Sequence, residues 1–494
     1  KLSNCTNLAG RELYQAWLGC SQENDAADCL ETLKQEGISK VNWLIVDHYG
    51  LDITWEKQLL NELQRNQSKP KLLAIDDLAD RNHMANLLLD QNFFGTNTDE
   101  RYRSIVPEDC RQLIGPHYAL LGPEYAKLHP LVPNRTKLRR VLIFFGGVDP
   151  DNLTCQTIKA LMDPALAHLA VDVVIGRQSS HRQLVIDLVN ERPNTTLHES
   201  LPSLAELITK ADLGIGAGGA TTWERACLRL PSLVIAIADN QLSMAKALEQ
   251  SNHLRLIGNG VETSMTEIRS TLLEIISKPY EEGDAVRSLT DGWGASRIAM
   301  CMLGAPQEIQ LRNAEKTDEA LLLRWANESN VRASSFSPDS IEPEIHKKWF
   351  QKILVDTNRL LLIATEANGC PIGQIRFDLI SADNKDDLDE AKIDLSLDRC
   401  IRGQGLASEI IRLGIEAMTK HWGLRVKAIA EVLKSNIASN ACFARANFIR
   451  EEVSGGDNLI GFTNAVHRWA WYPEMSQNKP IKQEINNNTK QSKT

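Results

Sequence analysis

The stretch that decides the fold is GIGAGGATTWERACLRLPSLVIAIADNQ, at residues 214–241. An apolar strand at 211–215 runs into a cluster of glycines, and a helix opened by Thr221 and Thr222 follows directly. Glycines let a ligand approach the backbone closely, and the amides at a helix N-terminus favour an anion such as a diphosphate. A second apolar strand, at 232–236, ends where open α/β sheets bind ligands. The pattern predicts an α/β fold with a nucleotide site formed by Gly218, Gly219, Glu224, Asn240 and Gln241.

The same stretch allows a purely structural interpretation. Thr221 and Glu224 have the spacing of a capping box, which closes a helix N-terminus, and the glycines can simply shape a turn. The loop alone does not decide between these two interpretations, because glycine-rich turns between a strand and a helix are common in α/β proteins.

Four further segments accompany this loop in a fixed order: WLIVDHYG (43–50), IDDLADRNHMANLLLDQN (75–92), LLGPEYAKL (120–128) and LIFFGGVDPDN (142–152). Together they resemble the UDP-sugar hydrolases of pseudaminic acid synthesis (UDP-2,4-diacetamido-2,4,6-trideoxy-beta-L-altropyranose hydrolases), an offshoot of the inverting GT-B glycosyltransferases. The resemblance covers residues 16 to 303. It implies two Rossmann-like halves, a ribose held by Glu224, a diphosphate held by the glycines, and sugar-diphosphate contacts from Gly147, Asn240 and Gln241.

The first half departs from the family pattern. In the resembled hydrolases a first βα unit carries a Gly-x-Gly-His loop whose histidine is the proposed general base, and this sequence contains no such loop. We therefore expect an incomplete first half, in which strands run at 43–47, 72–76 and 86–90, and impaired hydrolase activity. Whether the gap reflects a fragment or a genuine loss stays open.

Several polar residues of this region have two possible roles. His48 is a candidate replacement base, although a structural hydrogen bond is the commoner role. Asp47 ends the same strand and can face the cleft. Asp76 and Asp77 end the next strand and can cap the segment that follows. Asp149 and Asn152 can reach a ligand or form a plain turn.

A second signal is AKIDLSLDRCIRGQGLASEIIRLGIEAM, at residues 391–418. An alternating strand meets a turn with two glycines, and an amphipathic helix follows. With GQIRFD (373–378), NIASNACFARANF (436–448) and RWANESNVRASSFS (324–337), it resembles the GNAT acetyltransferases over residues 309 to 472.

The GNAT resemblance implies acetyl-CoA as co-substrate and no metal. The pyrophosphate of acetyl-CoA would lie on the amides of the loop, and its pantetheine would lie along the strand. The implied residues are Leu395, Leu397, Arg402, Gly403, Gln404, Gly405, Leu406 and Ala407. Asn436 is expected to bond the cofactor amide or to cap a helix. A base or a water chain must remove the proton of the amine. Asp394 and Asp398 lie near the right strand for this, but a surface-facing carboxylate is the expected role of each. Phe443 stands where many relatives have a tyrosine that serves as the catalytic acid, so the catalytic acid and base are unassigned. Cys442 is interpreted as a small hydrophobic residue.

Composition restricts the class of protein. The 494 residues carry a net charge of -9, with a pI near 5.8, which argues against binding to nucleic acid or to an anionic membrane. The sequence has neither an apolar run that would span a bilayer nor a secretory signal, and its ten cysteines form no Cys-x-x-Cys pair, so we expect a cytoplasmic protein. Oligomeric state is not predicted.

We expect four parts: a partial Rossmann-like half at 1–136, a UDP-binding half at 137–304, a GNAT α+β domain at 309–475 and a disordered tail at 476–494. The leading functional hypothesis is a bifunctional enzyme that acetylates the 4-amino group of a UDP-linked 4-amino-4,6-dideoxy sugar and then releases UDP from the diacetamido sugar. The alternatives are a non-catalytic UDP-sugar-binding module in the first part, and a GNAT domain that acetylates a protein N-terminus.

Overall fold

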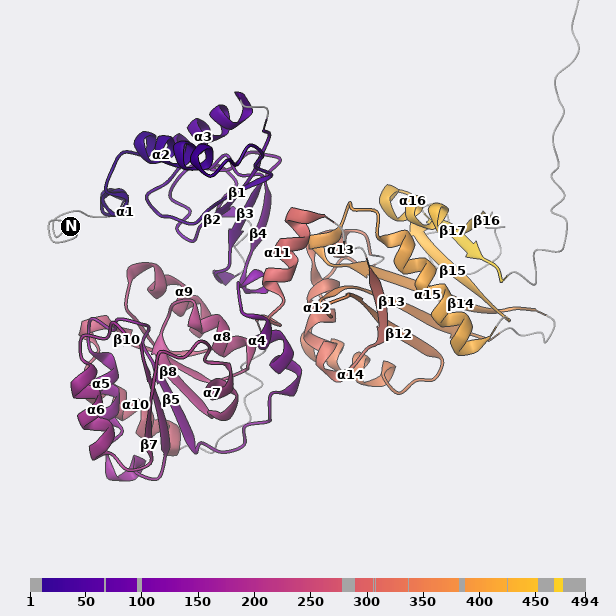
Figure 1. Cartoon of the computed structure of the whole chain (residues 1–494). Coiled ribbons are helices and arrows are strands. Elements are labelled where there is room, and N and C mark those ends of the chain that lie inside the picture. Colours follow the sequence, from indigo (N-terminus) through magenta and orange to yellow (C-terminus); the bar gives the residue numbers. More distant parts are fainter. Residues whose placement is uncertain are drawn as a thin grey trace, which may run out of the picture. The chain divides into compact units, whose positions relative to one another are not determined.

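The structure is a computed structural model, and it describes residues 11–65, 68–95, 100–277, 289–304, 306, 308–335, 337–381, 387–423, 425–451 and 466–473 (Figure 1). The tail predicted to be disordered, 476–494, lies outside the described residues. The chain divides into two compact units, Lys1–Met302 and Leu303–Thr494.

The first unit begins with a small parallel sheet in the order β1-β2-β3-β4. Its strands are β1 Trp43–Val46, β2 Lys71–Ile75, β3 Leu87–Asp90 and β4 Arg111–Ile114, and helices α1 Arg11–Leu18, α2 Gln22–Gln35 and α3 Ile53–Arg65 precede or connect them. Trp55 and Leu59 of α3 are buried in one cluster with Leu72 and Leu88 of the sheet. β4 is a correction to the three strands expected here: its sequence, RQLI, has only two apolar residues and only Leu113 is buried.

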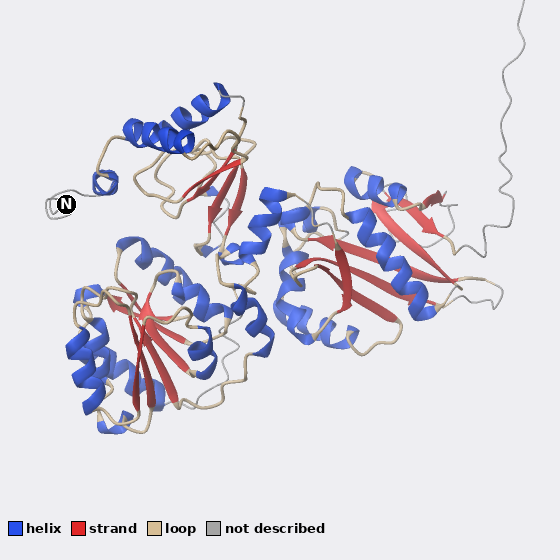
Figure 2. Ribbon diagram, viewed as in Figure 1, coloured by secondary structure: helices blue, strands red, loops and turns tan. Residues whose placement is uncertain are grey.

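The rest of this unit is a six-stranded parallel sheet in the order β10-β9-β8-β5-β6-β7, with helices on both of its faces (Figure 2). The strands are β5 Arg140–Phe144, β6 Ala170–Ile175, β7 Thr195–Glu199, β8 Leu213–Ala217, β9 Ser232–Ala236 and β10 Arg255–Asn259. The helices are α4 Pro123–Leu128, α5 Leu153–Ala160, α6 Arg182–Glu191, α7 Ala205–Lys210, α8 Thr221–Cys227, α9 Asp239–Gln250, α10 Met265–Ser277 and α11 Gly294–Leu303.

The strand order of the larger sheet creates a switch point. From β5 the chain moves outward to β6 and β7, and then returns to place β8 on the other side of β5. The loops after β5 and β8 therefore leave the sheet side by side in opposite directions, and a crevice opens between such loops in α/β proteins. The glycine loop singled out in the sequence follows β8.

Helix α11 packs on the four-stranded sheet of this unit. Ile298 is buried with Leu73, Leu89 and Tyr118 of the four-stranded part. The indole of Trp43 donates a hydrogen bond of 3.0 Å to the carbonyl oxygen of Met302. The end of the larger half thus packs back onto the smaller one.

The second unit is a mixed sheet in the order β11-β12-β13-β14-β15-β17-β16, in which only β14 and β15 pair in parallel. Its strands are β11 Ile309–Asn313, β12 Arg359–Glu366, β13 Pro371–Ile380, β14 Asp389–Leu397, β15 Val426–Leu433, β16 Ile449–Glu451 and β17 Val466–Trp471. Its helices are α12 Glu319–Asn327, α13 Ser329–Ala333, α14 Pro343–Ile353, α15 Ala407–Trp422 and α16 Ile437–Arg445. The predicted fold class is confirmed: two Rossmann-like parallel bodies are followed by an α+β domain.

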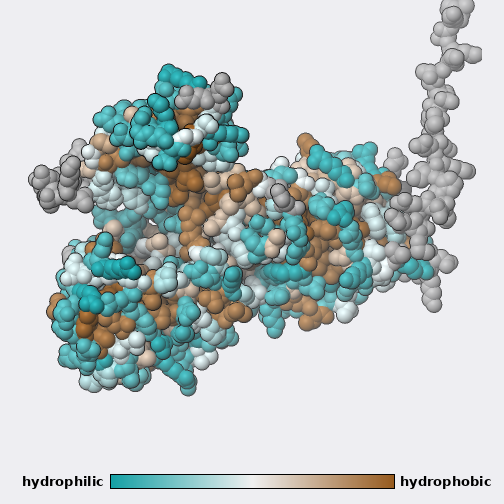
Figure 3. All heavy atoms as spheres, viewed as in Figure 1, coloured by the Kyte–Doolittle hydropathy of each residue, from teal (hydrophilic) through white to brown (hydrophobic). Residues whose placement is uncertain are grey.

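On the face shown in Figure 3, hydrophilic side chains cover much of each unit and apolar ones are scattered between them. Among the helices that the structure describes, none is long and apolar enough to cross a bilayer.

Candidate functional site

The glycine loop after β8 lies at the switch point of the larger sheet. Gly216 is required for the packing of β8 on β5, because a Cβ atom there would lie 2.2 Å from the carbonyl oxygen of Phe144. Gly218 and Gly219 follow, and a Cβ atom on them would lie 3.3 Å and 3.6 Å from side-chain atoms of Gln241. The structure thus brings the predicted loop glycines together with the start of α9.

Glu224 does not form the capping box. Helix α8 has Ala220 as its N-cap and no side-chain cap hydrogen bond. The Glu224 carboxylate is instead buried beside the phenol of Tyr125, and burial raises its pKa above the usual range. Its Oε2 atom has no hydrogen-bond partner among the described residues. A buried, half-satisfied carboxylate beside the glycine loop is suited to accept a hydrogen bond from a ligand hydroxyl.

Arg225 is a contributor that the sequence analysis missed. Its guanidinium donates to the carbonyl oxygen of Ala217 at 2.8 Å and to the hydroxyl of Thr221 at 3.2 Å. Burial lowers the pKa of Arg225 to about 10, so the side chain stays protonated at neutral pH. The buried cation braces the turn between β8 and α8.

The turn after β5 brings Gly147 to the same switch point. Gly146 has a φ of +94°, and a Cβ atom on Gly176 would lie 2.3 Å from the carbonyl oxygen of Gly147. Asp149 has a structural role, because its carboxylate accepts from the amides of Leu153 and Thr154 at the start of α5, both at 3.0 Å. Asn152 is the N-cap residue of α5, with no side-chain cap hydrogen bond.

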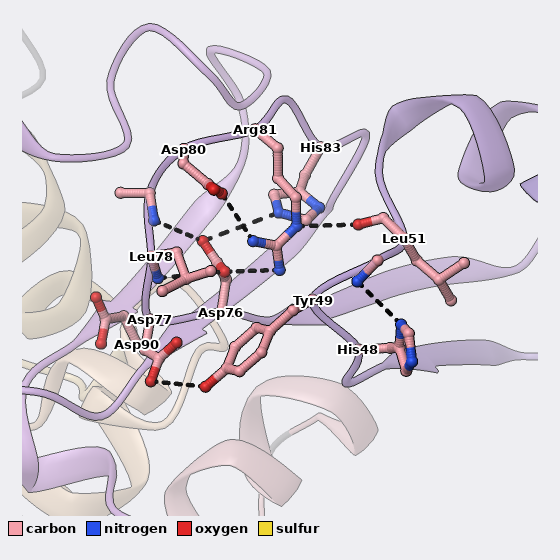
Figure 4. Close-up of polar contacts among 12 residues, drawn as sticks. His48, Tyr49, Leu51, Asp76, Asp77, Leu78, Asp80, Arg81, His83 and Asp90 are labelled. Carbon is pink, nitrogen blue, oxygen red and sulfur yellow. Dashed lines mark hydrogen bonds and ion pairs between the residues drawn. The ribbon is translucent and has the colours of Figure 1, made fainter. Parts of the chain in front are cut away.

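The loop after β2 is braced by buried charges (Figure 4). Asp76 is 2% exposed, forms an ion pair of 2.7 Å with Arg81 and accepts from the amide of Ala79 at 2.9 Å. Asp76 therefore caps the loop that follows β2, which is the role expected for it from the sequence. His48 accepts a hydrogen bond of 3.0 Å from the amide of Gly50, which is a local structural contact.

In the second unit, β14 and β15 separate along their length. They pair only between residues 389–392 of β14 and 426–429 of β15. Beyond Lys392, β14 continues to Leu397 with β13 as its partner, while β15 continues to Leu433 with β17 on its other edge. Within the part of the chain that the structure describes, one edge of β14 is thus unpaired across Leu395 and Leu397, so its amides and carbonyls can bond an extended ligand.

The glycine loop at the end of β14 opens helix α15. Gly403 and Gly405 have φ values of +79° and +83°, a left-handed conformation that side chains disfavour. The guanidinium of Arg402 donates to the carbonyl oxygen of Leu397 at 2.9 and 2.7 Å and pairs with Glu328 at 2.6 Å. The side chain of Gln404 donates to the carbonyl oxygen of Cys400 at 3.1 Å. These two side chains shape the loop, while the backbone at residues 405–407 begins a 16-residue helix.

Two expectations for this unit need correction or refinement. Asp398 is not surface-facing: it is 1% exposed, and it accepts from the indole of Trp325 at 2.8 Å and from the amide of Cys400 at 3.0 Å. Asn436 is the N-cap of α16, because its side chain accepts from the amide of Ser439 at 3.0 Å.

A cavity of about 470 Å³ lies between β13, β14 and helices α12 to α14. Trp325 and Trp349 supply aromatic walls, and Asp394 and Ser396 line it from alternate positions of β14. The side chain of Asp394 is 52% exposed, so it faces this cavity rather than being buried. His346 also lines it, and burial lowers the pKa of that histidine.

Parts of the chain are similar to known proteins. Residues 308–449 match the model of the acetyltransferase (GNAT) domain family. The chain is 22% identical to an uncharacterized protein of Methanocaldococcus jannaschii over 446 residues, which is 87% of this chain and 84% of that protein. It is 27% identical to the spore coat polysaccharide biosynthesis protein SpsG of Bacillus subtilis over 167 residues, 34% of this chain and 49% of SpsG.

Two solved structures are similar to about a third of the chain. One is an aminoglycoside acetyltransferase AAC(6')-Ib with coenzyme A (20% identity, 33% of this chain, 95% of that chain, TM-score 0.28). The other is the spermidine N-acetyltransferase of Vibrio cholerae with CoA and spermine (17% identity, 33% and 94%, TM-score 0.29). On the strength of the family match over residues 308–449, the second unit of this chain contains a GNAT acetyltransferase domain.

Proposed function

We propose that the chain is a bifunctional nucleotide-sugar enzyme. Its second unit transfers an acetyl group from acetyl-CoA to the amine of a UDP-linked 4-amino sugar, and its first unit binds the UDP-sugar. Release of UDP from the acetylated product is the hydrolase step that the resemblance implies, and we expect it to be impaired because this sequence contains no Gly-x-Gly-His loop. The observation that carries the proposal is the unpaired edge of β14, which leads directly into the Gly403–Gly405 loop and the N-terminus of α15. The GNAT family match and the polysaccharide-biosynthesis relative support it.

The unpaired edge and the loop suit the two ends of acetyl-CoA. Pantetheine carries amide groups that can continue the pairing pattern of β14 at Leu395 and Leu397. The pyrophosphate is an anion, and the amides that open α15 are unpaired donors at the positive end of a helix dipole. The left-handed glycines at 403 and 405 leave the loop without side chains that would block the phosphates.

The cavity beside β14 is the natural place for the amine acceptor. Asp394 can hold the acceptor ammonium and accept one proton from it, and the neutral amine then attacks the acetyl carbonyl. The new bond is C–N, the C–S bond breaks, and the sulfur leaves with the electron pair and takes the second proton that the nitrogen gives up. Gln374 fixes the carboxylate by a hydrogen bond of 2.8 Å. Phe443 is 6% exposed and packs on Phe448, so it supplies no proton.

The charges around the cavity favour a particular class of acceptor. Arg332 and Arg376 line the cavity together with the single carboxylate of Asp394. Arg376 is compensated by ion pairs with Asp378 at 3.2 Å and with Asp394 at 3.9 Å. The guanidinium of Arg332 donates to backbone and hydroxyl oxygens, so its charge favours an acceptor that carries an anionic group as well as an amine. A UDP-linked amino sugar has this composition, because its diphosphate is anionic.

In the first unit, Glu224 and the loop glycines support binding of UDP. Glu224 is a buried carboxylate with an unpartnered oxygen, which suits a ribose hydroxyl, and Gly218 and Gly219 leave room for a diphosphate at the switch point. The alternative is a UDP-sugar-binding module without hydrolysis. Release of UDP from the diacetamido sugar distinguishes an enzyme from such a module.

The first experiment is isothermal calorimetry on the full chain with acetyl-CoA, and separately with UDP. We expect saturable binding of both ligands, each unaffected by the other at the resolution of the method. Absence of acetyl-CoA binding would refute the transferase assignment, and absence of UDP binding would refute the nucleotide site.

A further inference from the structure

Three polar side chains of the first unit converge on one carboxylate, that of Asp77 at the end of β2. The phenol of Tyr49 donates to Oδ2 at 3.0 Å, and the side-chain amides of Asn92 and Asn240 lie at 3.4 and 3.5 Å from the same oxygen. These residues follow β1, β3 and β9, so both sheets of the unit contribute. Figure 4 shows the phenol of Tyr49 directed at the carboxylate of Asp77.

The other oxygen of the carboxylate lacks a partner. Oδ1 of Asp77 is buried and makes no hydrogen bond within the described part of the chain. Burial raises the pKa of Asp77, while the hydrogen bond from Tyr49 opposes that shift. A buried acceptor without a donor costs folding free energy, and a donor supplied by a ligand removes that cost.

The contacts made by residues near Asp77 fix its position without involving its Oδ1 atom. The carboxylate of Asp76 takes the local capping and ion-pair contacts with Ala79 and Arg81. The guanidinium of Arg101 donates to the backbone oxygen of Asp77 at 3.0 Å. The backbone oxygen of Asp77 is therefore held by Arg101, and Oδ1 is the atom of its side chain that is left for a ligand.

A series of contacts connects Asp77 to the glycine loop after β8. Asn240, which reaches Asp77, is the chain neighbour of Gln241, and Gln241 lies against Gly218 and Gly219. A diphosphate that rests on these glycines therefore lies beside Gln241, and Asn240 connects this position to Asp77. Since the ribose of a UDP-sugar is assigned to Glu224, the group left to reach Asp77 is the sugar.

We infer that Asp77 is the carboxylate that receives the sugar of a UDP-linked sugar, by accepting a hydrogen bond from a hydroxyl or an acetamido N–H group at Oδ1. The inference rests on the proposed UDP site. An ionised carboxylate only accepts hydrogen bonds and repels anions, so the same residue excludes a third phosphate. Asp77 thereby selects nucleoside diphosphate sugars over nucleoside triphosphates.

The test measures the affinity of the full chain for UDP, UDP-N-acetylglucosamine and UTP, in the native protein and in two variants. Asp77→Asn keeps the shape of the side chain and removes its charge. Asp80→Asn makes the same change three residues along, at a carboxylate that is 38% exposed and pairs with Arg81.

For Asp77→Asn we expect about tenfold weaker binding of UDP-N-acetylglucosamine, as for one lost charge-assisted hydrogen bond, with UDP unchanged and UTP bound more tightly. Asp80→Asn should match the native protein for all three ligands. Opposite shifts for the sugar and the triphosphate cannot come from a general loss of structure.

Failure of the nucleotide site and failure of the role given to Asp77 produce different results. If the native protein binds no UDP, the nucleotide site and this inference both fall. If UDP binds but the sugar adds no affinity, or if Asp77→Asn weakens UDP and UDP-N-acetylglucosamine equally, the nucleotide site stands and the role given to Asp77 is wrong.

Discussion

The side-chain nitrogen of Gln374 donates a hydrogen bond of 2.8 Å to Oδ2 of Asp394, between neighbouring strands β13 and β14. The contact holds the carboxylate at the wall of the cavity, on the strand whose far edge is unpaired. An amine in the cavity and a thioester lying along β14 would therefore meet beside a fixed proton acceptor.

Asp394→Asn removes that acceptor with little change in shape. We expect kcat/KM for the amine to fall by about 100-fold, the usual scale of general-base catalysis, with acetyl-CoA affinity unchanged. Initial rates of thiol release measure the first quantity and calorimetry the second. The matched control is Asp389→Asn, which lies on the same strand but outside the cavity-lining set. Equal rates for Asp394→Asn and the native enzyme would exclude Asp394 as base.

Gly405→Val should abolish measurable binding of acetyl-CoA. The φ of Gly405 is +83°, so a β-branched side chain strains the turn and also projects into the loop proposed to hold the pyrophosphate. Gly423→Val is the control for strain alone, since Gly423 has a φ of +90° at the other end of the same helix. Both variants should lower the melting temperature, but only Gly405→Val should lose the ligand. Retained binding in Gly405→Val would contradict the loop assignment.

Glu224→Ala should weaken UDP by about 1 to 3 kcal/mol, the range for a lost hydrogen bond to a buried charged group. Because α8 is capped at Ala220 without a side-chain bond, the substitution removes no helix cap. Glu206→Ala, an exposed carboxylate in α7 of the same half, should leave UDP affinity unchanged. A variant that loses thermal stability but binds UDP normally would show that Glu224 is structural.

The stability of the first unit should depend on the charge of Asp90. Burial raises the pKa of this carboxyl from 3.8 to about 7, against opposing hydrogen bonds from Asn92 and Tyr102. The folded state therefore binds the proton more tightly than the unfolded chain, and the stabilisation present below pH 3.8 is lost as pH rises through about 7. Asp90→Asn mimics the protonated form. In denaturant titrations from pH 4 to pH 7.5, the native protein should lose stability relative to Asp90→Asn; a pH-independent difference would contradict this.

Much of the fold follows from local sequence. Apolar runs predicted β1, β2, β3, β8 and β9 to within a residue or two. β4 and β10 were missed because RQLI and RLIGN mix polar and apolar residues, and their pairing depends on neighbouring strands. In a parallel sheet these neighbouring strands are distant in the sequence, so a local pattern does not reveal them.

The candidate sites were less predictable than the fold. The glycine loop before α15 could be recognised because Gly403 and Gly405 have positive φ, and the loop after β8 because close packing at Gly216 leaves no room for a side chain. The burial of Asp398 could not, since it depends on Trp325, 73 positions away in the sequence. The bracing by Arg225 and the convergence on Asp77 likewise depend on contacts between elements that no periodicity reveals.

The most direct test of the account is one reaction on the full chain, with acetyl-CoA and a UDP-linked 4-amino-4,6-dideoxy sugar, followed for thiol release and, by mass spectrometry, for the acetylated UDP-sugar. We predict thiol release that is matched by N-acetylated product and lost in Gly405→Val. The account would be contradicted if this sugar gave no thiol above background while spermidine, an aminoglycoside or a peptide N-terminus was acetylated at enzymatic rates.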